Sequence, residues 1–271
     1  MTTSDLPELA ELAGRAARYG GRLGVVVHDL ESGARAAVGA DAPFTSASVI
    51  KLPVLMTVLD RTAAGALSLD DRLPIADADR VDGTGIIGDL ADLRELSVRD
   101  LLTAMIALSD NTATNILINR VSMDAVNAWS AAAGLRATSL VRLMRDTEAR
   151  ARGLENTMSP DDAAVLLARL ARGELAGPDA TAFALGALHR QRFNDRLPRL
   201  LPDGVRVAHK TGELPGVRHD AGLLYGPDGR APIVVAAMTE GFTGPACESE
   251  TGGPAADLLA EAARLAYDRF R

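Results

Sequence analysis

The sequence predicts an α+β fold, an α/β sandwich in which an antiparallel five-stranded sheet is flanked by helices. Three observations predict it: a helical pattern and a hairpin open the chain, helical patterns fill its middle, and three strand patterns with a closing helix end it. A sheet formed by both chain ends, with an all-α insertion between them, fits that order. We therefore expect a single module over residues 1–271, with an α/β part at about 1–45 and 190–271 and an all-α part at about 46–189.

A helix and a hairpin are expected first. Apolar residues recur at helical spacing over residues 5–18, with Ser4 or Asp5 as the cap. Apolar, mostly β-branched residues then predict a strand at 23–29, and a turn at 31–33 leads into a returning strand at 34–38.

The stretch 44–56 combines an apolar pattern with two reactive side chains. We expect a buried helix that begins near residue 47 or 48 and runs to about residue 64. Residues three apart share a helical face, so Ser48 Oγ and Lys51 Nζ can meet. A lysine whose pKa is lowered can take the proton of a serine and make it nucleophilic. A capping serine beside an ordinary surface lysine is the simpler alternative.

The middle of the chain is predicted to be loops and helices. Residues 65–95 are loop-rich and acidic, but they lack the glycine and glutamate register of a calcium loop, which indicates a solvated loop. Two helices are expected between residues 97 and 120, separated by a polar break at 109–112 that suits a new N-cap.

Three more helices are predicted at about 123–133, 160–172 and 179–190. Between the first two, residues 139–159 are charged and weakly periodic, which is typical of an Ω-type surface loop.

Strand patterns return in the last third of the chain. They cover residues 205–212, 221–225 and 232–238, and a Gly-Pro-Asp-Gly turn at 226–229 joins the last two. A helix over 254–270 closes the chain with one apolar face.

Composition excludes several function classes. The net charge of −7 and the pI of about 5.2 argue against a nucleic-acid partner. The single cysteine, Cys247, cannot form an intrachain disulfide, and the four histidines lack ligand spacing, so we expect no metal and no cofactor. We expect no membrane partner, because no apolar run reaches the roughly 18 residues of a spanning helix.

The first ten residues lack the basic and apolar regions of a signal peptide. We therefore expect a cytoplasmic protein; the alternative is an exported protein whose signal has been removed. We expect a monomer.

Three short motifs follow one another at long spacing and in suitable contexts. They are Ser48-x-x-Lys51, Ser109-Asp110-Asn111 and Lys210-Thr211-Gly212. The set resembles the penicilloyl-serine family of class A β-lactamases and penicillin-binding D,D-peptidases, and the resemblance covers roughly residues 20–270. The flanking residues agree with it: Phe44, the run Ser109–Asn115, and His209.

The resemblance implies a role for each motif residue. Ser48 would attack an amide or ester carbonyl, Lys51 would be its base or proton relay, and Ser109 would pass the proton to the leaving nitrogen. Asn111 would hold Lys51 or a substrate amide. Backbone N–H groups of Ser48 and Glu213 would form the oxyanion hole.

The third motif would recognise the substrate. Lys210 would supply positive charge for a substrate carboxylate and lower the pKa of Lys51, and Thr211, next to Gly212, would hydrogen-bond that carboxylate. Arg218 is a candidate second carboxylate anchor, and His219 is as close to the family's position.

The sequence departs from the class A pattern in the predicted Ω-type loop. The family's Glu-x-x-Leu-Asn motif, whose glutamate activates the deacylating water, is missing. Counting forward from Arg142 places the matching position near Thr147, which Asp146 and Glu148 flank, whereas counting back from Met158 places it near Leu143. Asp146 and Glu148 are the candidate replacements; a surface role for either is equally compatible with the sequence. Without a placed base, acylation can proceed while hydrolysis stalls.

The sequence leaves three functions open. The resemblance favours an acyl-serine hydrolase that cleaves a β-lactam or another carboxylate-bearing amide or ester. An esterase, amidase, acyltransferase or D,D-peptidase of the same fold would deacylate penicillins slowly. A non-catalytic penicillin-binding or sensor module is the third, although the complete motif set argues against it.

Overall fold

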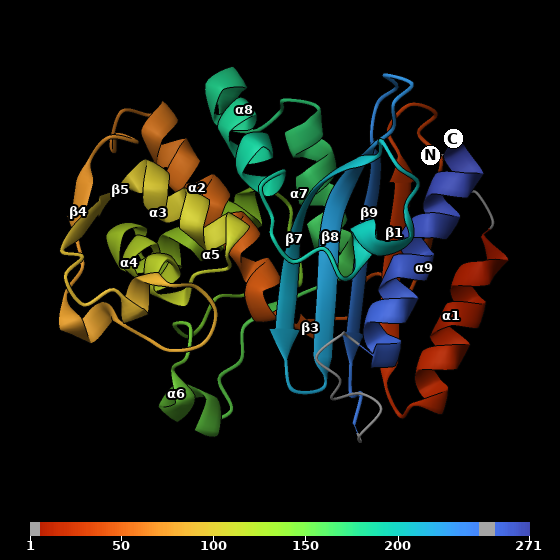
Figure 1. Ribbon diagram of the computed structural model, residues 1–271, viewed down its shortest axis with the longest axis horizontal. Coiled ribbons are helices and arrows are strands. Elements are labelled where there is room, and N and C mark those ends of the chain that lie inside the picture. The colour runs from red at the N-terminus through yellow and green to blue at the C-terminus, as the bar shows by residue number, and fades with distance from the viewer. Residues whose placement is uncertain (1–5, 244–252) are drawn as a thin grey trace.

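An antiparallel sheet lies between two helical layers in the computed structural model, which describes residues 6–243 and 253–271 (Figure 1). Within these residues the main sheet has five strands in the order β2-β1-β9-β8-β7. They are β1 (Arg22–Asp29), β2 (Arg35–Val38), β7 (Arg206–Leu214), β8 (Val217–Tyr225) and β9 (Ile233–Glu240). Strands from the two chain ends therefore pair in one sheet, as the sequence predicted.

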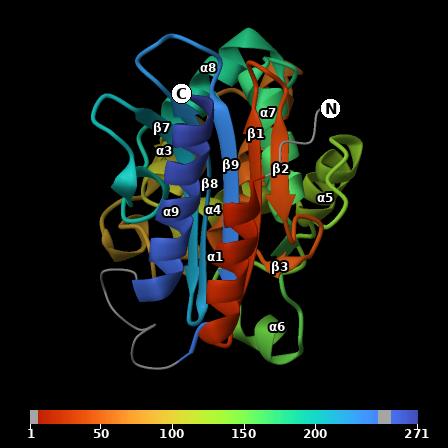
Figure 2. The same ribbon diagram turned by 90° about the vertical axis from the view of Figure 1, so that its right-hand side faces the viewer.

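Helices α1 (Pro7–Arg18) and α9 (Gly253–Phe270) cover one face of the sheet side by side (Figure 2). Neighbouring residues of β1 point to opposite faces, as its pleat requires. Val25 and Val27 pack into the core under α1 and α9, whereas Val26 joins the larger core on the other side. Both faces are buried, which explains why the central strands read as nearly continuous apolar runs.

The larger helical layer covers the opposite face of the sheet. It contains α2 (Lys51–Ala63), α3 (Val98–Ala107), α4 (Asn111–Val121), α5 (Met123–Ala132), α6 (Thr147–Ala151), α7 (Pro160–Ala171) and α8 (Gly177–Leu188). The first nine residues of α2 are all buried, as expected for a central helix. Helix α7 packs directly on β1 and β9, so the part of the chain predicted to be all-α also supplies a layer of the sandwich.

Short elements complete the layer. Two small antiparallel pairs were not predicted: β3 (Phe44–Thr45) with β6 (Thr157–Met158), and β4 (Arg72–Pro74) with β5 (Glu95–Ser97). Four 3₁₀ turns lie at η1 (Ala47–Ile50), η2 (Asp77–Asp79), η3 (Ile87–Asp89) and η4 (Leu197–Leu200).

Two predicted boundaries were wrong. The serine lies in η1 rather than in an α-helix, which begins only at Lys51. Strand β8 begins at Val217, not at Ala221, because a two-residue turn at 215–216 folds β7 and β8 into one long hairpin.

Other predicted elements are confirmed. The polar break is an N-cap, since Asp110 Oδ1 accepts the Ala113 N–H at 2.8 Å at the start of α4. Residues 139–159 form a loop whose ends meet, because Ser139 and Thr157 exchange two backbone hydrogen bonds of 3.0 Å. The predicted caps Ser4 and Asp5, and Cys247, lie outside the described residues.

None of the helices within residues 6–243 and 253–271 is long and apolar enough to cross a membrane. Over the same ranges, no three His, Cys, Asp or Glu side chains are grouped as metal ligands.

Candidate active site

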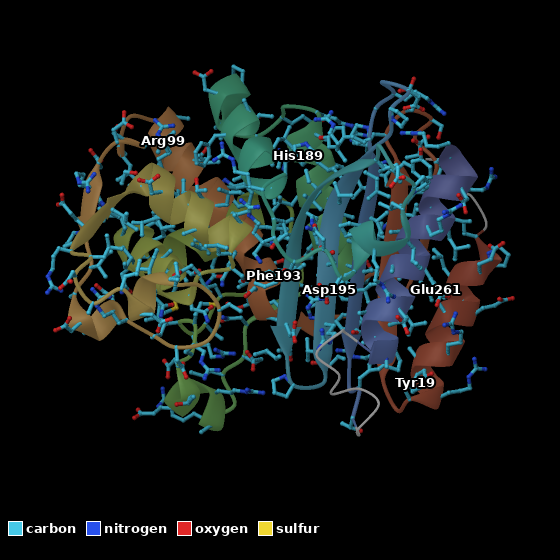
Figure 3. All side chains as sticks on the ribbon, in the orientation of Figure 1. Tyr19, Arg99, His189, Phe193, Asp195 and Glu261 are labelled. Carbon is cyan, nitrogen blue, oxygen red and sulfur yellow. The ribbon has the colours of Figure 1, made fainter. Side chains whose placement is uncertain are left out.

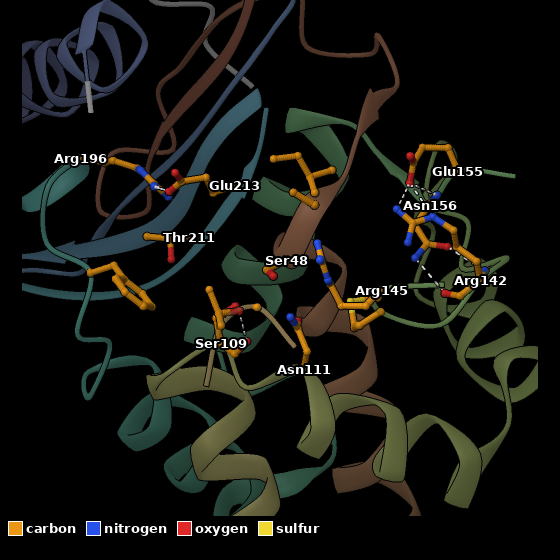
Figure 4. A pocket seen from close by; sticks show the side chains of 16 residues that line it. Ser48, Ser109, Asn111, Arg142, Arg145, Glu155, Asn156, Arg196, Thr211 and Glu213 are labelled. Atoms are coloured by element: carbon orange, nitrogen blue, oxygen red, sulfur yellow. Dashed lines mark hydrogen bonds and ion pairs between the residues drawn. The ribbon is translucent and has the colours of Figure 1, made fainter. Parts of the chain in front are cut away.

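A cleft of about 180 Å³ lies where the β7 edge of the sheet meets the larger helical layer (Figure 4). Its wall comes from segments far apart in the sequence. The lining residues include Ser48, Thr84, Ser109, Asn111, Arg142, Met144, Arg145, Glu155, Phe193, Arg196, Thr211 and Glu213. Figure 3 shows Phe193 at this boundary, between β7 and the helices. All three sequence motifs therefore meet at one place.

Ser48 is presented to the cleft by a strained turn. The preceding Ala47 has φ of 44°, a left-handed conformation that is rare for residues other than glycine. The residues after the serine, Val49 and Ile50, are fully buried and anchor the turn in the core. Ser48 itself remains half-buried and lines the cleft. The strained backbone at Ala47 thus directs the Ser48 hydroxyl toward the cleft.

Ser109, which also lines the cleft, has a left-handed backbone conformation as well. Its φ is 54°, and it follows the last turn of α3. The next residue, Asp110, caps α4 and also accepts the N–H groups of Ile86 and Ile87 at 2.7 and 2.9 Å. The helix junction and the 83–88 loop are therefore tied together behind the serine.

Lys51 is fully buried beneath the cleft floor. Its Nζ donates to the backbone O of Ser109 at 2.7 Å, to Asn111 Oδ1 at 3.0 Å and to Ser109 Oγ at 3.1 Å. Burial lowers the pKa of Lys51 to about 7, against a smaller opposing effect of Asp110. At this pKa a substantial fraction of the amine is neutral and can accept a proton near neutral pH.

Lys210 approaches the same hydroxyl from β7. Its Nζ lies 3.1 Å from Ser109 Oγ and donates to the backbone O of Thr211 at 2.8 Å. Burial, and secondly the charge of Lys51, lower the pKa of Lys210 well below its usual value. Ser109 Oγ therefore bridges two buried amines, and the charge of Lys51 disfavours protonation of Lys210.

The chain contains 27 arginines and only two lysines, and both lysines lie here. An arginine cannot lose its proton in a protein, whereas a buried lysine can. Lysine is thus confined to the place where a titratable cation is needed. This composition signal was available in the sequence and would have strengthened the motif argument.

The edge of β7 supplies a backbone donor next to Ser48. In an antiparallel strand the backbone groups of alternate residues point away from the neighbouring strand. Thr211 O points to the open edge, since it accepts the Lys210 Nζ–H at 2.8 Å. Glu213 shares that parity, so its N–H points to the same edge. A Cβ added at Gly212 would lie 3.2 Å from Ser48 N, which shows how closely strand and turn approach.

The predicted carboxylate anchors need correction. Arg218 does not line the cleft; it lies behind Glu213 and forms ion pairs with Glu213 at 3.1 Å and Asp195 at 3.7 Å. Arg196 does line the cleft, together with Arg142 and Arg145, and sequence reasoning missed it. It is 2% exposed, pairs with the Glu213 carboxylate and donates to the backbone O of Gly212 at 3.3 Å.

His219 was also placed wrongly in the substrate site. It is fully buried, and its Nε2 lies 2.7 Å from the backbone O of Thr45, while Nδ1 lies 3.2 Å from the Thr239 N–H. Burial lowers the pKa of His219 to about 4, so the ring is neutral and cannot attract a carboxylate. Its role is structural, joining β3 to β8.

Neither carboxylate predicted to activate water lies in the cleft. Asp146 caps α6 by accepting the Ala149 N–H at 2.8 Å, and Glu148 is exposed on that helix. Helix α6 projects away from the sheet (Figure 1). The predicted positions are therefore wrong because residues 146–151 form a helix that carries both side chains away from Ser48.

Met144 is one of the side chains of this loop that do line the cleft, and it is 8% exposed. Its backbone is clamped by Asn115, which accepts the Met144 N–H at 2.8 Å and donates to the Met144 O at 3.0 Å. Glu155 also lines the cleft, but its carboxylate forms an ion pair with Arg142 of the same loop.

Comparison with known proteins shows the family of this chain. The sequence profile of the Beta-lactamase enzyme family matches residues 7–270. The chain belongs to this family. Its relatives include a β-lactamase of Streptomyces albus G, 31% identical over 264 residues, which cover 94% of this chain and 82% of the relative.

Solved structures of the β-lactamase family superpose over nearly the whole chain. A β-lactamase from Sphaerobacter thermophilus has a TM-score of 0.88 and 31% identity and covers 98% of each chain. A mutant of PBP-A, solved as an acyl-enzyme complex with penicillin G, has a TM-score of 0.87 and 27% identity and covers 99% of this chain and 97% of its own. The predicted fold and family resemblance are confirmed.

Proposed function

We propose that this chain hydrolyses β-lactam amides through an acyl-enzyme formed on Ser48. The observation that carries the proposal is the hydroxyl of Ser109 held 3.1 Å from two buried amines, beside a nucleophile aimed into the same cleft. Serine β-lactamase-type hydrolysis is the activity of the family. One neighbour forms an acyl-enzyme with penicillin G, which supports the covalent route.

Acylation uses groups whose positions the fold fixes. Neutral Lys51 accepts the Ser48 proton, directly after rotation of the serine side chain or through Ser109, while Oγ attacks the lactam carbonyl. The N–H groups of Ser48 and Glu213 stabilise the oxyanion. The intermediate collapses, the C–N bond breaks, and Ser109 gives its proton to the leaving nitrogen and recovers one from a lysine.

Among the described residues, no hydrogen bond joins Lys51 Nζ to Ser48 Oγ. Catalytic hydrogen bonds often tighten only in the substrate complex.

The carboxylate of the substrate is expected at the Thr211 end of the cleft. Thr211 is next to Lys210, and Arg196 is the buried guanidinium on that side. The Glu213 carboxylate now pairs with Arg196, so a bound substrate carboxylate must share or replace that pairing.

Deacylation is expected to be the slower step. Within the described residues the cleft is lined by two carboxylates, Glu155 and Glu213, and both pair with arginines. A carboxylate held by an arginine has fewer free lone pairs with which to bind a water. Lys51 remains as the base that can activate water, at a pKa of about 7.

The module is proposed to act as a single unit and as a monomer, because residues of all three sequence motifs meet in its cleft.

Replacing Ser48 by alanine tests the function. We expect wild-type protein to hydrolyse a chromogenic cephalosporin and Ser48→Ala to lose this activity completely. Ser130→Ala is the matched control, because Ser130 is buried in α5 and its hydroxyl donates to the Val126 carbonyl at 2.8 Å. Equal turnover by the wild type and Ser48→Ala would overturn the proposal.

The pH dependence of acylation follows from Lys51. Below pH 7 the amine is protonated and cannot accept the serine proton, so acylation is slow; above pH 7 it is neutral and the rate reaches a plateau. We expect the rate constant for acylation by benzylpenicillin to rise through a midpoint near pH 7, measured by stopped-flow. A flat profile between pH 5 and 9 would contradict Lys51 as the base.

A further inference from the structure

Arg145 stands out on the wall of the cleft. It has φ of 65°, one of five positive values among described residues other than glycine, and three of these five residues line the cleft. The neighbouring Met144 is buried and Asp146 turns into α6, so the left-handed backbone at Arg145 directs its side chain separately from both. Strain of this kind often marks a functional position.

One carboxylate holds the guanidinium of Arg145, but some of its N–H donors take no part in that contact. Its Nε and Nη2 bind the two carboxylate oxygens of Asp82 at 2.6 and 2.8 Å, which fixes the plane of the fork. A guanidinium has five N–H donors, and this contact uses one side of it. Over the described residues, Nη1 makes no hydrogen bond to another side chain or to the backbone.

Arg145 lies on the side of Ser48 away from Thr211 and Arg196 (Figure 4). In a penicillin the ring carboxylate and the acylamino group extend in opposite directions from the lactam carbonyl. With the ring carboxylate at Thr211, the acyl side chain reaches Asn111 and Arg145.

We propose that Arg145 recognises a second carboxylate, on the acyl side chain of the substrate, so that the enzyme prefers dianionic β-lactams. This inference rests on the proposed function and adds the substrate class. The side chain of Arg145 is 43% exposed, so solvent weakens the interaction and the preference is moderate.

Carbenicillin and benzylpenicillin are suitable probes because they differ by one carboxylate on the acyl side chain. The quantity to measure is the ratio of their second-order acylation rate constants. We expect Arg145→Gln to lower this ratio about tenfold, as for one partly exposed charge-assisted contact.

Arg145→Gly is the second variant, since glycine accepts φ of 65° without strain and the fold is preserved. It should lower the ratio as much as Arg145→Gln. Arg152→Gln, an exposed arginine at the end of α6, is the matched control and should keep the wild-type ratio.

The outcomes separate this inference from the proposed function. A wild-type ratio in both Arg145→Gln and Arg145→Gly overturns the inference while leaving the proposed function intact, provided benzylpenicillin still acylates Ser48. Absence of acylation by either penicillin in the wild type overturns the proposed function and the inference with it.

Discussion

Replacing Lys51 by methionine is expected to lower the rate constant for acylation by benzylpenicillin about a hundredfold to ten-thousandfold, the usual contribution of a general base. Methionine is similar in length and fills the buried site but cannot accept a proton. The effect should be measured by rapid-quench mass spectrometry at pH 8, where wild-type Lys51 is mostly neutral.

A stability measurement distinguishes lost chemistry from lost structure. The pKa of Lys51 is about 7 in the folded protein and about 10.4 in an unfolded chain. Between these values the unfolded chain binds more protons, so stability rises with pH; below pH 7 the burial cost is present in full. Lys51→Met removes that cost and should melt at or above the wild-type temperature at pH 6. Wild-type acylation by this variant would contradict the role of Lys51.

Replacing Met144 by glutamate is expected to speed deacylation about a hundredfold, because it would add a general base to the wall of the cleft. Asn115 clamps the backbone of residue 144, so the new side chain is presented from a fixed position. Accumulated acyl-enzyme should fall and steady-state hydrolysis of benzylpenicillin should rise.

Met144→Gln is the matched control, since its amide has the same shape as the glutamate carboxylate but cannot act as a base. The prediction requires Met144→Glu to exceed both the wild type and Met144→Gln in the rate of adduct loss. Equal adduct lifetimes in all three proteins would show that residue 144 does not reach the water that attacks the acyl-enzyme.

Local patterns were sufficient to predict most of the helices and strands and the three motifs that meet in the cleft. The stretch around Ser48, the polar break at Ser109 and the strand that contains Lys210 each have a distinct local pattern, and their order along the chain predicted one site. The clustering of both lysines in that site shows that the signal was also present in composition.

Long-range contacts explain what was missed. Arg196 enters the cleft because its loop folds back over β7, where buried Asp220 accepts the Leu197 N–H at 3.1 Å and contacts His209 Nδ1 at 2.8 Å. No local pattern near Arg196 encodes that arrangement. The start of β8 was not predicted because residues 218–220 are polar, and polar residues are uncommon in a central strand. In the folded protein each of these side chains has a partner that tertiary structure supplies.

The loop residues were misplaced for a related reason. Asp146 and Glu148 have suitable chemistry, but a cap at Asp146 begins α6 and turns both side chains outward. Counting along the chain cannot detect that turn, and it left Met144 unnoticed at the position that faces the cleft.

A titration of the two lysines by NMR tests whether Lys51 can be the base that activates Ser48. Protein labelled with ¹³C at lysine Cε should give two side-chain signals, since the chain contains only Lys51 and Lys210, and Lys51→Met assigns them. We expect the Lys51 signal to titrate near pH 7. Titration near the ordinary lysine value of about 10.4 would contradict it, because a permanently protonated amine cannot activate Ser48.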